Sequence, residues 1–158
     1  MPNGPIFWYS ASAVTSGLIF ALAKPAGGQE YGLGKSATSF TDATWRLFFQ
    51  TPTSLPGTTA KLRLLGLADN ATDGTIVFEP KWASVAIGEG GSGASILSEG
   101  ATSLAFPTAS QNKYVETKLA LDADTVVAGE VITMDLVIDA AATTLTTSAL
   151  FLPMIIWE

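Results

Sequence analysis

The sequence predicts an all-β domain: one antiparallel β-sandwich or jelly roll of about eight strands, with little or no helix, spanning residues 1–158. Three observations predict it. Several runs alternate apolar and polar side chains with period two, as strands with one buried face do. Turn-forming residues separate these runs at fairly even spacing. No apolar period of 3.6 residues is sustained long enough to predict a helix.

Three strand-like runs occupy the first half of the chain. The first places Trp45, Leu47 and Phe49 on one face. The second, Ala60–Ala68, alternates leucines with a lysine and an arginine, and the third is Thr75–Trp82. In each run one face is apolar, so we expect that face to pack on a core.

Turn chemistry separates these runs. Leu55-Pro56-Gly57 predicts a tight connection between the first two runs, and Asp69–Gly74 (DNATDG) predicts a hairpin loop between the next two. The glycine-rich segment Gly88–Ser95 predicts a flexible loop.

Two further runs follow, Val115–Leu121 and Ile132–Ile138. Between them, Asp122-Ala123-Asp124 and Ala128-Gly129-Glu130 predict a two-part corner.

The last run, Leu150–Trp157, is apolar on both faces, which is typical of a central strand covered on both sides. Pro153 within it cannot donate a ladder hydrogen bond and favours an edge or a bulge. We favour burial within the sandwich, with contact to another subunit as the alternative.

The composition excludes several functions. The chain has no Cys and no His, so it lacks the thiolate and imidazole groups of the commonest nucleophilic and zinc sites, and we predict neither a catalytic site nor a cofactor. Its eight cations are scattered and its net charge is −6, which disfavours a nucleic-acid partner. Polar residues and prolines interrupt residues 1–23, so we predict no membrane span.

Acidic residues offer weak candidates for chemistry. Asp69 and Asp73 loosely resemble part of a calcium loop, but Asx and glycine residues also serve turns, and we favour the turn. Glu79, Glu116 and Asp135 alternate with apolar neighbours. We therefore expect them to lie on the outer sheet faces and to form ion pairs rather than a hydrolase pair. The expected partners are Lys61, Arg63, Lys81 and Lys118.

Seven aromatic residues could form a sugar-stacking platform: Trp8, Tyr9, Tyr31, Trp45, Trp82, Tyr114 and Trp157. Trp45 and Trp82 share faces with apolar neighbours, so we expect them in the core. Trp8, Tyr9 and Tyr31 fall outside clear patterns and are better candidates for an exposed contact.

Three stretches carry a resemblance to a known class of proteins: Ala43–Ala68, Lys118–Asp139 and Leu150–Glu158. Their aromatic-rich strand, the "AGE" corner before a strand and the apolar final strand resemble small jelly-roll virion proteins of tailed bacteriophages, most of all capsid decoration proteins. The resemblance implies a homotrimer that binds the major capsid protein, and it implies no catalytic residues. Residues 1–5 would form an N-terminal arm, restricted in conformation by its two prolines.

We therefore predict a virion structural protein on the capsid surface, made in the host cytoplasm, with itself and the major capsid protein as partners. The low charged fraction of 14% suits a protein that hides surface in an assembly. The interface candidates are Pro2, Pro5, Trp8, Tyr9, Tyr31, Phe151, Pro153 and Trp157. The alternative is a β-sandwich module that binds glycans or a cell surface, such as a phage receptor-binding domain, and an enzyme ranks third.

Overall fold

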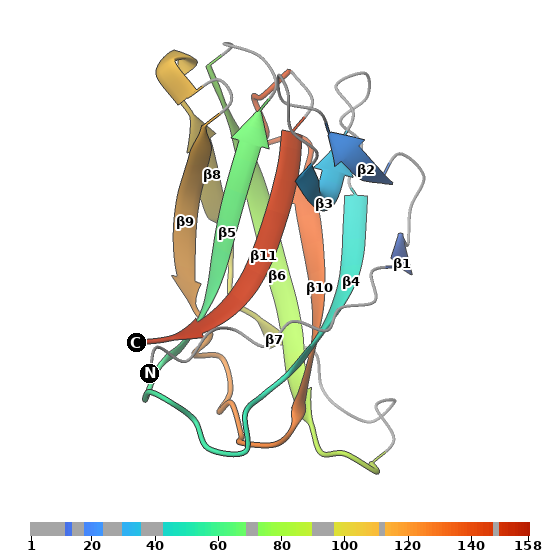
Figure 1. The fold of residues 1–158 in the computed structure, drawn as a ribbon, viewed down its shortest axis with the longest axis vertical. Helices are drawn as coiled ribbons and strands as arrows, with labels where there is room; N and C mark the ends of the chain where they lie inside the picture. Colours follow the sequence, from blue (N-terminus) through green and yellow to red (C-terminus); the bar gives the residue numbers. More distant parts are fainter. Residues whose placement is uncertain are drawn as a thin grey trace.

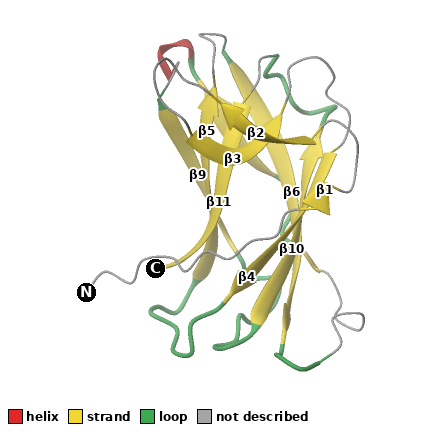
Figure 2. Ribbon diagram, turned by 45° about the vertical axis from the view of Figure 1, so that its right-hand side comes forward, coloured by secondary structure: helices red, strands yellow, loops and turns green. Residues whose placement is uncertain are grey.

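The computed structural model describes residues 12–13, 18–23, 30–35, 43–68, 73–89, 97–110, 113–146 and 149–158. These residues form two antiparallel sheets that face each other (Figures 1 and 2). The predicted all-β sandwich is confirmed. The helical content of the described residues is one 3₁₀ turn at Thr108–Ser110.

The first sheet contains β1 (Ser12–Ala13), β4 (Ala43–Gln50), β10 (Val131–Asp139), β6 (Gly74–Val85) and β7 (Leu97–Ser98) in that order, with β8 (Thr102–Phe106) also paired to β6. The second contains β2 (Leu18–Ala23), β3 (Glu30–Lys35), β11 (Ala149–Trp157), β5 (Ala60–Ala68) and β9 (Tyr114–Ala120). We call them sheet A and sheet B.

The chain passes repeatedly between the two sheets. From β3 to β6 each successive strand lies in the opposite sheet, and the same holds from β8 to β11. The resulting neighbours are β4-β10-β6-β8 in sheet A and β3-β11-β5-β9 in sheet B. This is the strand order of an eight-stranded jelly roll.

The predicted hairpin at Asp69–Gly74 is wrong. Strand β5 ends at Ala68 in sheet B and β6 begins at Gly74 in sheet A, so these consecutive strands do not pair. Turn residues indicate a connection between strands, but they do not specify whether the flanking strands share a sheet. Residues 69–72 and most of the predicted glycine-rich loop, residues 90–95, lie outside the described residues.

The core lies between the sheets and follows the period-two pattern. Trp45, Leu47 and Phe49 of β4 are buried, as predicted, and so are alternate residues of β5, β6 and β10. Phe151 of β11 is fully buried, and its ring packs against those of Phe78, Trp45 and Phe106 at centroid distances of 5.1, 5.8 and 6.4 Å.

Strand β11 is central in sheet B, which explains why it is apolar on both faces. It pairs with β5 along its whole length, from Ala149 to Trp157, but its described pairing with β3 ends at Phe151. Pro153 therefore lies beyond the described β3 ladder, where a missing N–H costs no bond to that strand. Its side chain is buried. A proline and a central position are compatible here because the described ladder between β11 and β3 ends before Pro153.

Candidate functional site

The two predicted core tryptophans are confirmed. Trp45 and Trp82 are 2% and 0% exposed, so neither can stack on a sugar at the surface. The Trp82 indole N–H donates to the carboxylate of Glu99 at 2.5 Å. Tyr114, by contrast, is 48% exposed at the beginning of β9.

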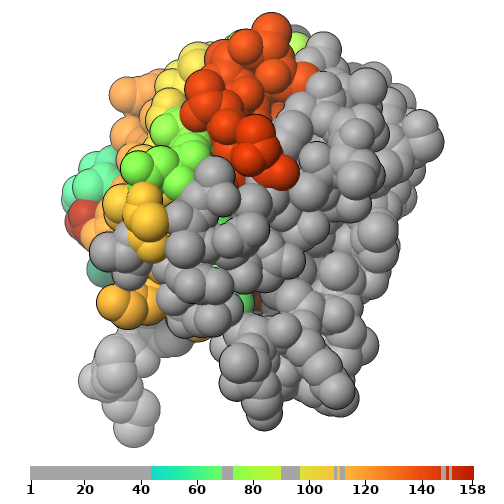
Figure 3. Space-filling view, turned by 90° about the horizontal axis from the view of Figure 1, so that it is seen from above, coloured from blue at the N-terminus to red at the C-terminus, as the bar shows by residue number. Residues whose placement is uncertain are grey.

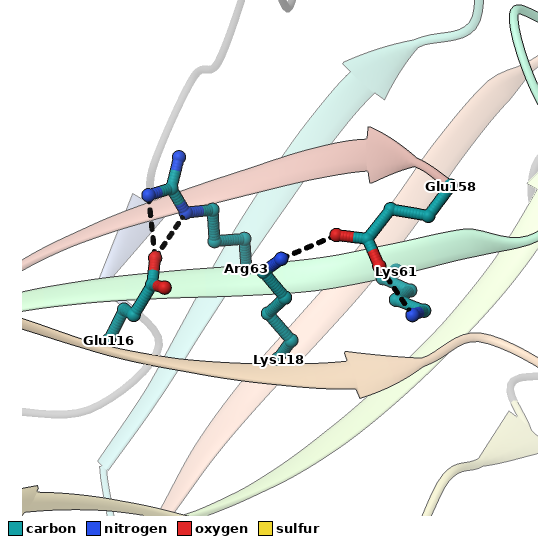
Figure 4. Close-up of polar contacts among 5 residues, drawn as sticks. All are labelled: Lys61, Arg63, Glu116, Lys118 and Glu158. Carbon is teal, nitrogen blue, oxygen red and sulfur yellow. Dashed lines mark hydrogen bonds and ion pairs between the residues drawn. The ribbon is translucent and has the colours of Figure 1, made fainter.

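The strand carboxylates lie on the outer sheet faces. Glu116 pairs with one of the predicted cations, whereas Asp135 pairs with Arg46, which was not among them. Glu116 accepts two hydrogen bonds from the guanidinium of Arg63 across β9 and β5, at 2.8 and 2.5 Å (Figure 4). On sheet A, both carboxylate oxygens of Asp135 accept bonds from Arg46, at 2.7 and 2.8 Å, and this carboxylate raises the pKa of the Arg46 guanidinium. These are cross-strand ion pairs of an ordinary sheet surface.

The calcium candidate falls partly outside the described residues, because they exclude Asp69. The exposed Asp73 accepts hydrogen bonds from the backbone N–H and the hydroxyl of Thr108. The described part of the chain contains no group of three or more acidic side chains placed to hold a metal ion. It also contains no helix long and apolar enough to cross a membrane.

The predicted interface residues are spread over different environments. Four of them, Pro2, Pro5, Trp8 and Tyr9, lie outside the described residues, and so does the side chain of Tyr31, whose backbone belongs to β3. Phe151 and Pro153 lie inside the core rather than on a surface. Trp157 is half-buried at the end of β11, and it lines a pocket.

This pocket, here called the end pocket, is lined by residues of the β4–β5 and β9–β10 connections and of the end of β11. The two connections lie in the lower part of Figure 1. Its volume is about 250 Å³. Its polar lining consists of Asp122, Asp124, Thr58, Thr59 and Thr125, and its apolar lining of Trp157, Leu55, Ala60, Leu121 and Val126. Figure 3 shows the opposite end, where the β10–β11 connection (dark orange) packs beside the beginning of β6, and the N–H of Thr144 donates to the Thr75 carbonyl at 2.8 Å.

Hydrogen bonds tie together the two connections that form the walls of the end pocket. The backbone N–H of Thr51 donates to the Glu130 carbonyl at 2.8 Å, and the N–H of Gly129 donates to the Pro52 carbonyl at 2.9 Å. The buried Thr51 hydroxyl lies 2.8 and 2.9 Å from the carbonyls of Val127 and Glu130, to which it donates. Because these bonds hold the walls in place, the pocket is formed before any ligand arrives.

The acidic side of the pocket has its own support. The Ala123 N–H, between the two aspartates, donates to the Glu99 carboxylate at 3.0 Å. The same Glu99 oxygen accepts the bond from the Trp82 indole, and therefore connects the corner to the core. Asp124 accepts a further bond from the Thr125 N–H at 2.7 Å.

The floor of the pocket is anchored through the C-terminal residue. Trp157 pairs with Ala60, and the next residue, Glu158, exchanges two backbone hydrogen bonds with Thr59, at 3.1 and 3.2 Å. The Glu158 carboxylate forms ion pairs with Lys61, at 2.6 Å, and with Lys118 (Figure 4). Hydrogen bonds from Lys118 and Lys61 lower the pKa of Glu158 to about 2. These contacts fix the end of β11 and with it the position of Trp157.

The pocket joins the chemical groups that recognise a sugar. An indole offers an apolar face to the C–H groups of a sugar ring, and carboxylates and hydroxyls exchange hydrogen bonds with its hydroxyl groups. The Nε1–H of Trp157 is buried and has no acceptor among the described residues.

Sequence reasoning assigned Asp122, Asp124 and Leu55 to turns and did not join them to Trp157. Their turn chemistry was visible, but no local pattern shows that two connections 60–70 residues apart meet around the end of a third segment. Only the jelly-roll topology brings them together.

No model of a protein family matches the sequence, and no curated protein matches it. Among solved structures, the chain is similar to the family 11 carbohydrate-binding module from Clostridium thermocellum in complex with a β-1,3-1,4-mixed-linked tetrasaccharide. The TM-score is 0.51 at 8% identity, over 99% of this chain and 92% of that one. It is also similar to TmCBM61 in complex with β-1,4-galactotriose (TM-score 0.47, 10% identity, 95% and 88% covered) and to the xylan-binding domain from CBM 22 (0.44, 11%, 98% and 95%). The likeness to the family 11 module shows a shared β-sandwich fold.

Proposed function

We propose that this protein is a glycan-binding β-sandwich module that holds its ligand in the end pocket. The observation that carries the proposal is the meeting of Trp157 with Asp122, Asp124 and three threonine hydroxyls in one pre-formed pocket. Ligand sites in proteins are concave and combine apolar walls with polar groups that orient the ligand, and the end pocket combines five apolar with five polar lining residues. The fold shared with a carbohydrate-binding module supports the same proposal. The function is binding rather than catalysis.

The test is a titration of the full chain with a panel of soluble oligosaccharides, followed by calorimetry and by intrinsic tryptophan fluorescence. We expect at least one glycan to bind and to change the emission. Replacing the exposed Asp122 with alanine removes a charge-assisted hydrogen bond, so we expect a loss of about tenfold or more in affinity. The matched control is Tyr114→Ala, which removes an exposed aromatic residue at the beginning of β9. The pocket lies at the other end of this strand, because its lining residue Leu121 follows the last residue of β9.

The proposal is refuted if no glycan of the panel binds at millimolar concentration. It is also refuted if Asp122→Ala and Tyr114→Ala weaken binding equally. A folded-state measurement, such as the thermal unfolding temperature of both variants, separates a lost contact from a lost fold.

Capsid decoration stays a prediction, because the similar structures include carbohydrate-binding modules and lend that role no support. Its partners, the trimer and the capsid location are tested by sedimentation of the protein alone and with capsids. A monomer that does not bind capsids would end this hypothesis.

A further inference from the structure

Resting on the proposed function, we propose that the end pocket recognises one sugar unit at the end of a glycan chain, and that this unit carries no negative charge. The proposal concerns the class of ligand, and it depends on the volume, the walls and the charge of the pocket.

The volume admits one sugar unit. At the density of a close-packed organic solid, an aldohexose occupies roughly 200 Å³ and two linked units roughly twice that. The end pocket measures about 250 Å³, which is room for one unit. Pockets that enclose larger organic ligands typically measure about 300–1,000 Å³.

The walls favour a chain end over an internal unit. The β4–β5 connection contributes Leu55 and Thr58 to the pocket, and the β9–β10 connection contributes Asp122 and Val126. Strand ends close the floor, where Ala60 pairs with Trp157. An internal unit needs an exit for the chain on both of its sides, as a groove across a sheet provides. A pocket that has a floor and two walls and is otherwise open suits a terminal unit, whose neighbour in the chain lies outside the pocket.

The charge of the pocket selects against acidic sugars. Two of its ten lining residues are aspartates, and no lysine or arginine is among them. Lys61, which follows the pocket residue Ala60 in β5, and Lys118 of β9 are already paired with Glu158. A uronic or sialic acid would bring its carboxylate beside these aspartates without a counter-charge, and like charges placed together at a binding site oppose binding.

The test compares matched ligands on the full chain by calorimetry. The ligands are methyl glycosides of neutral hexoses, the corresponding uronic acids, which have nearly the same size, and linear oligosaccharides of two to six units. For the preferred sugar, we expect the methyl glycoside to bind within about tenfold of the longest oligosaccharide. We expect its uronic acid to bind at least about tenfold more weakly.

Variants check the cause of the charge selectivity. The double variant Asp122→Asn and Asp124→Asn keeps the shape of the pocket and removes its charge, so the discrimination against the uronic acid should disappear. Glu79→Gln on sheet A removes one charge elsewhere and should leave the discrimination unchanged.

The outcomes separate this inference from the proposed function. If affinity rises more than about a hundredfold with chain length, or if the uronic acid binds as well as the neutral sugar, the inference is wrong while glycan binding stands. If no ligand of either kind binds, the proposed function itself fails.

Discussion

Gly66 of β5 faces β8 of the opposite sheet at close range, and its replacement by alanine tests the packing of the core. A Cβ atom at this position would lie 2.5 Å from Cδ2 of Leu104 and 2.6 Å from Cζ of Phe106, both in β8 of the opposite sheet. Carbon atoms in contact are normally about 3.5–4.0 Å apart. Both side chains would therefore move by about 1 Å, and both are already fully buried, at 0% and 1% exposure.

Two opposing effects set the change in the free energy of unfolding. Overpacking a core costs about 1–3 kcal/mol, whereas replacing glycine with alanine in a compatible backbone stabilises by about 0.4–1 kcal/mol through the unfolded chain. We expect Gly66→Ala to lower the free energy of unfolding by about 1–2 kcal/mol, which corresponds to a fall of about 2–8 °C in Tm for a domain of this size.

The assay is urea unfolding followed by tryptophan fluorescence. Adding Leu104→Ala makes room for the new methyl group, so the double variant should be less destabilised than the sum of the two single variants. A Gly66→Ala protein as stable as the wild type, or strictly additive effects, would show that the close approach of β5 and β8 is not as described.

Three further predictions use the same unfolding assay. Thr51→Val removes the buried hydroxyl that donates to the carbonyls of Val127 and Glu130, and we expect the free energy of unfolding to fall by about 1–3 kcal/mol. Thr51→Ser keeps the hydroxyl and should retain most of the stability. Asp135→Asn removes the negative charge from the half-exposed ion pair with Arg46. We expect the free energy of unfolding to fall by about 0.5–1 kcal/mol, and by less in high salt. A fall that salt does not change would contradict the ion-pair interpretation. The pKa of Glu158 is about 2 in the folded chain, below its usual value of 4.5, so its ion pairs stabilise the fold above pH 4.5 and this contribution disappears as the pH falls toward 2. The difference in unfolding free energy between the wild type and Glu158→Gln should therefore vanish between pH 4.5 and pH 2. A difference that stays constant over this interval would refute the reasoning.

The strands and the core could be predicted from the sequence because both depend on a local pattern. Alternation placed Leu62 and Ile132 on buried faces, and the structure buries both completely. Strand partners could not be predicted in the same way, because alternation shows which way a side chain faces and not which strand lies beside it. The predicted Asp69–Gly74 hairpin shows the limit, because the strands on either side of it, β5 and β6, lie in different sheets.

The candidate site was harder to predict than the fold. Asp122 and Thr58 are ordinary turn residues in the sequence, and they acquire a common role only when the topology brings their connections to Trp157. Gly66 did carry a local signal, since a glycine within a strand pattern often marks a close approach. The identity of the approaching side chains required the structure.

The central place of β11 has a consequence for how the domain folds. This strand comes last in the domain, yet it lies between β3 and β5, which precede it by more than 80 residues. During synthesis, the facing edges of β3 and β5 therefore have no hydrogen-bonding partner until residues 149–157 have left the ribosome. Folding of this kind depends on contacts between distant parts of the chain and is slow. We expect a chain shortened before β11 to be captured by chaperones or to aggregate through these open edges.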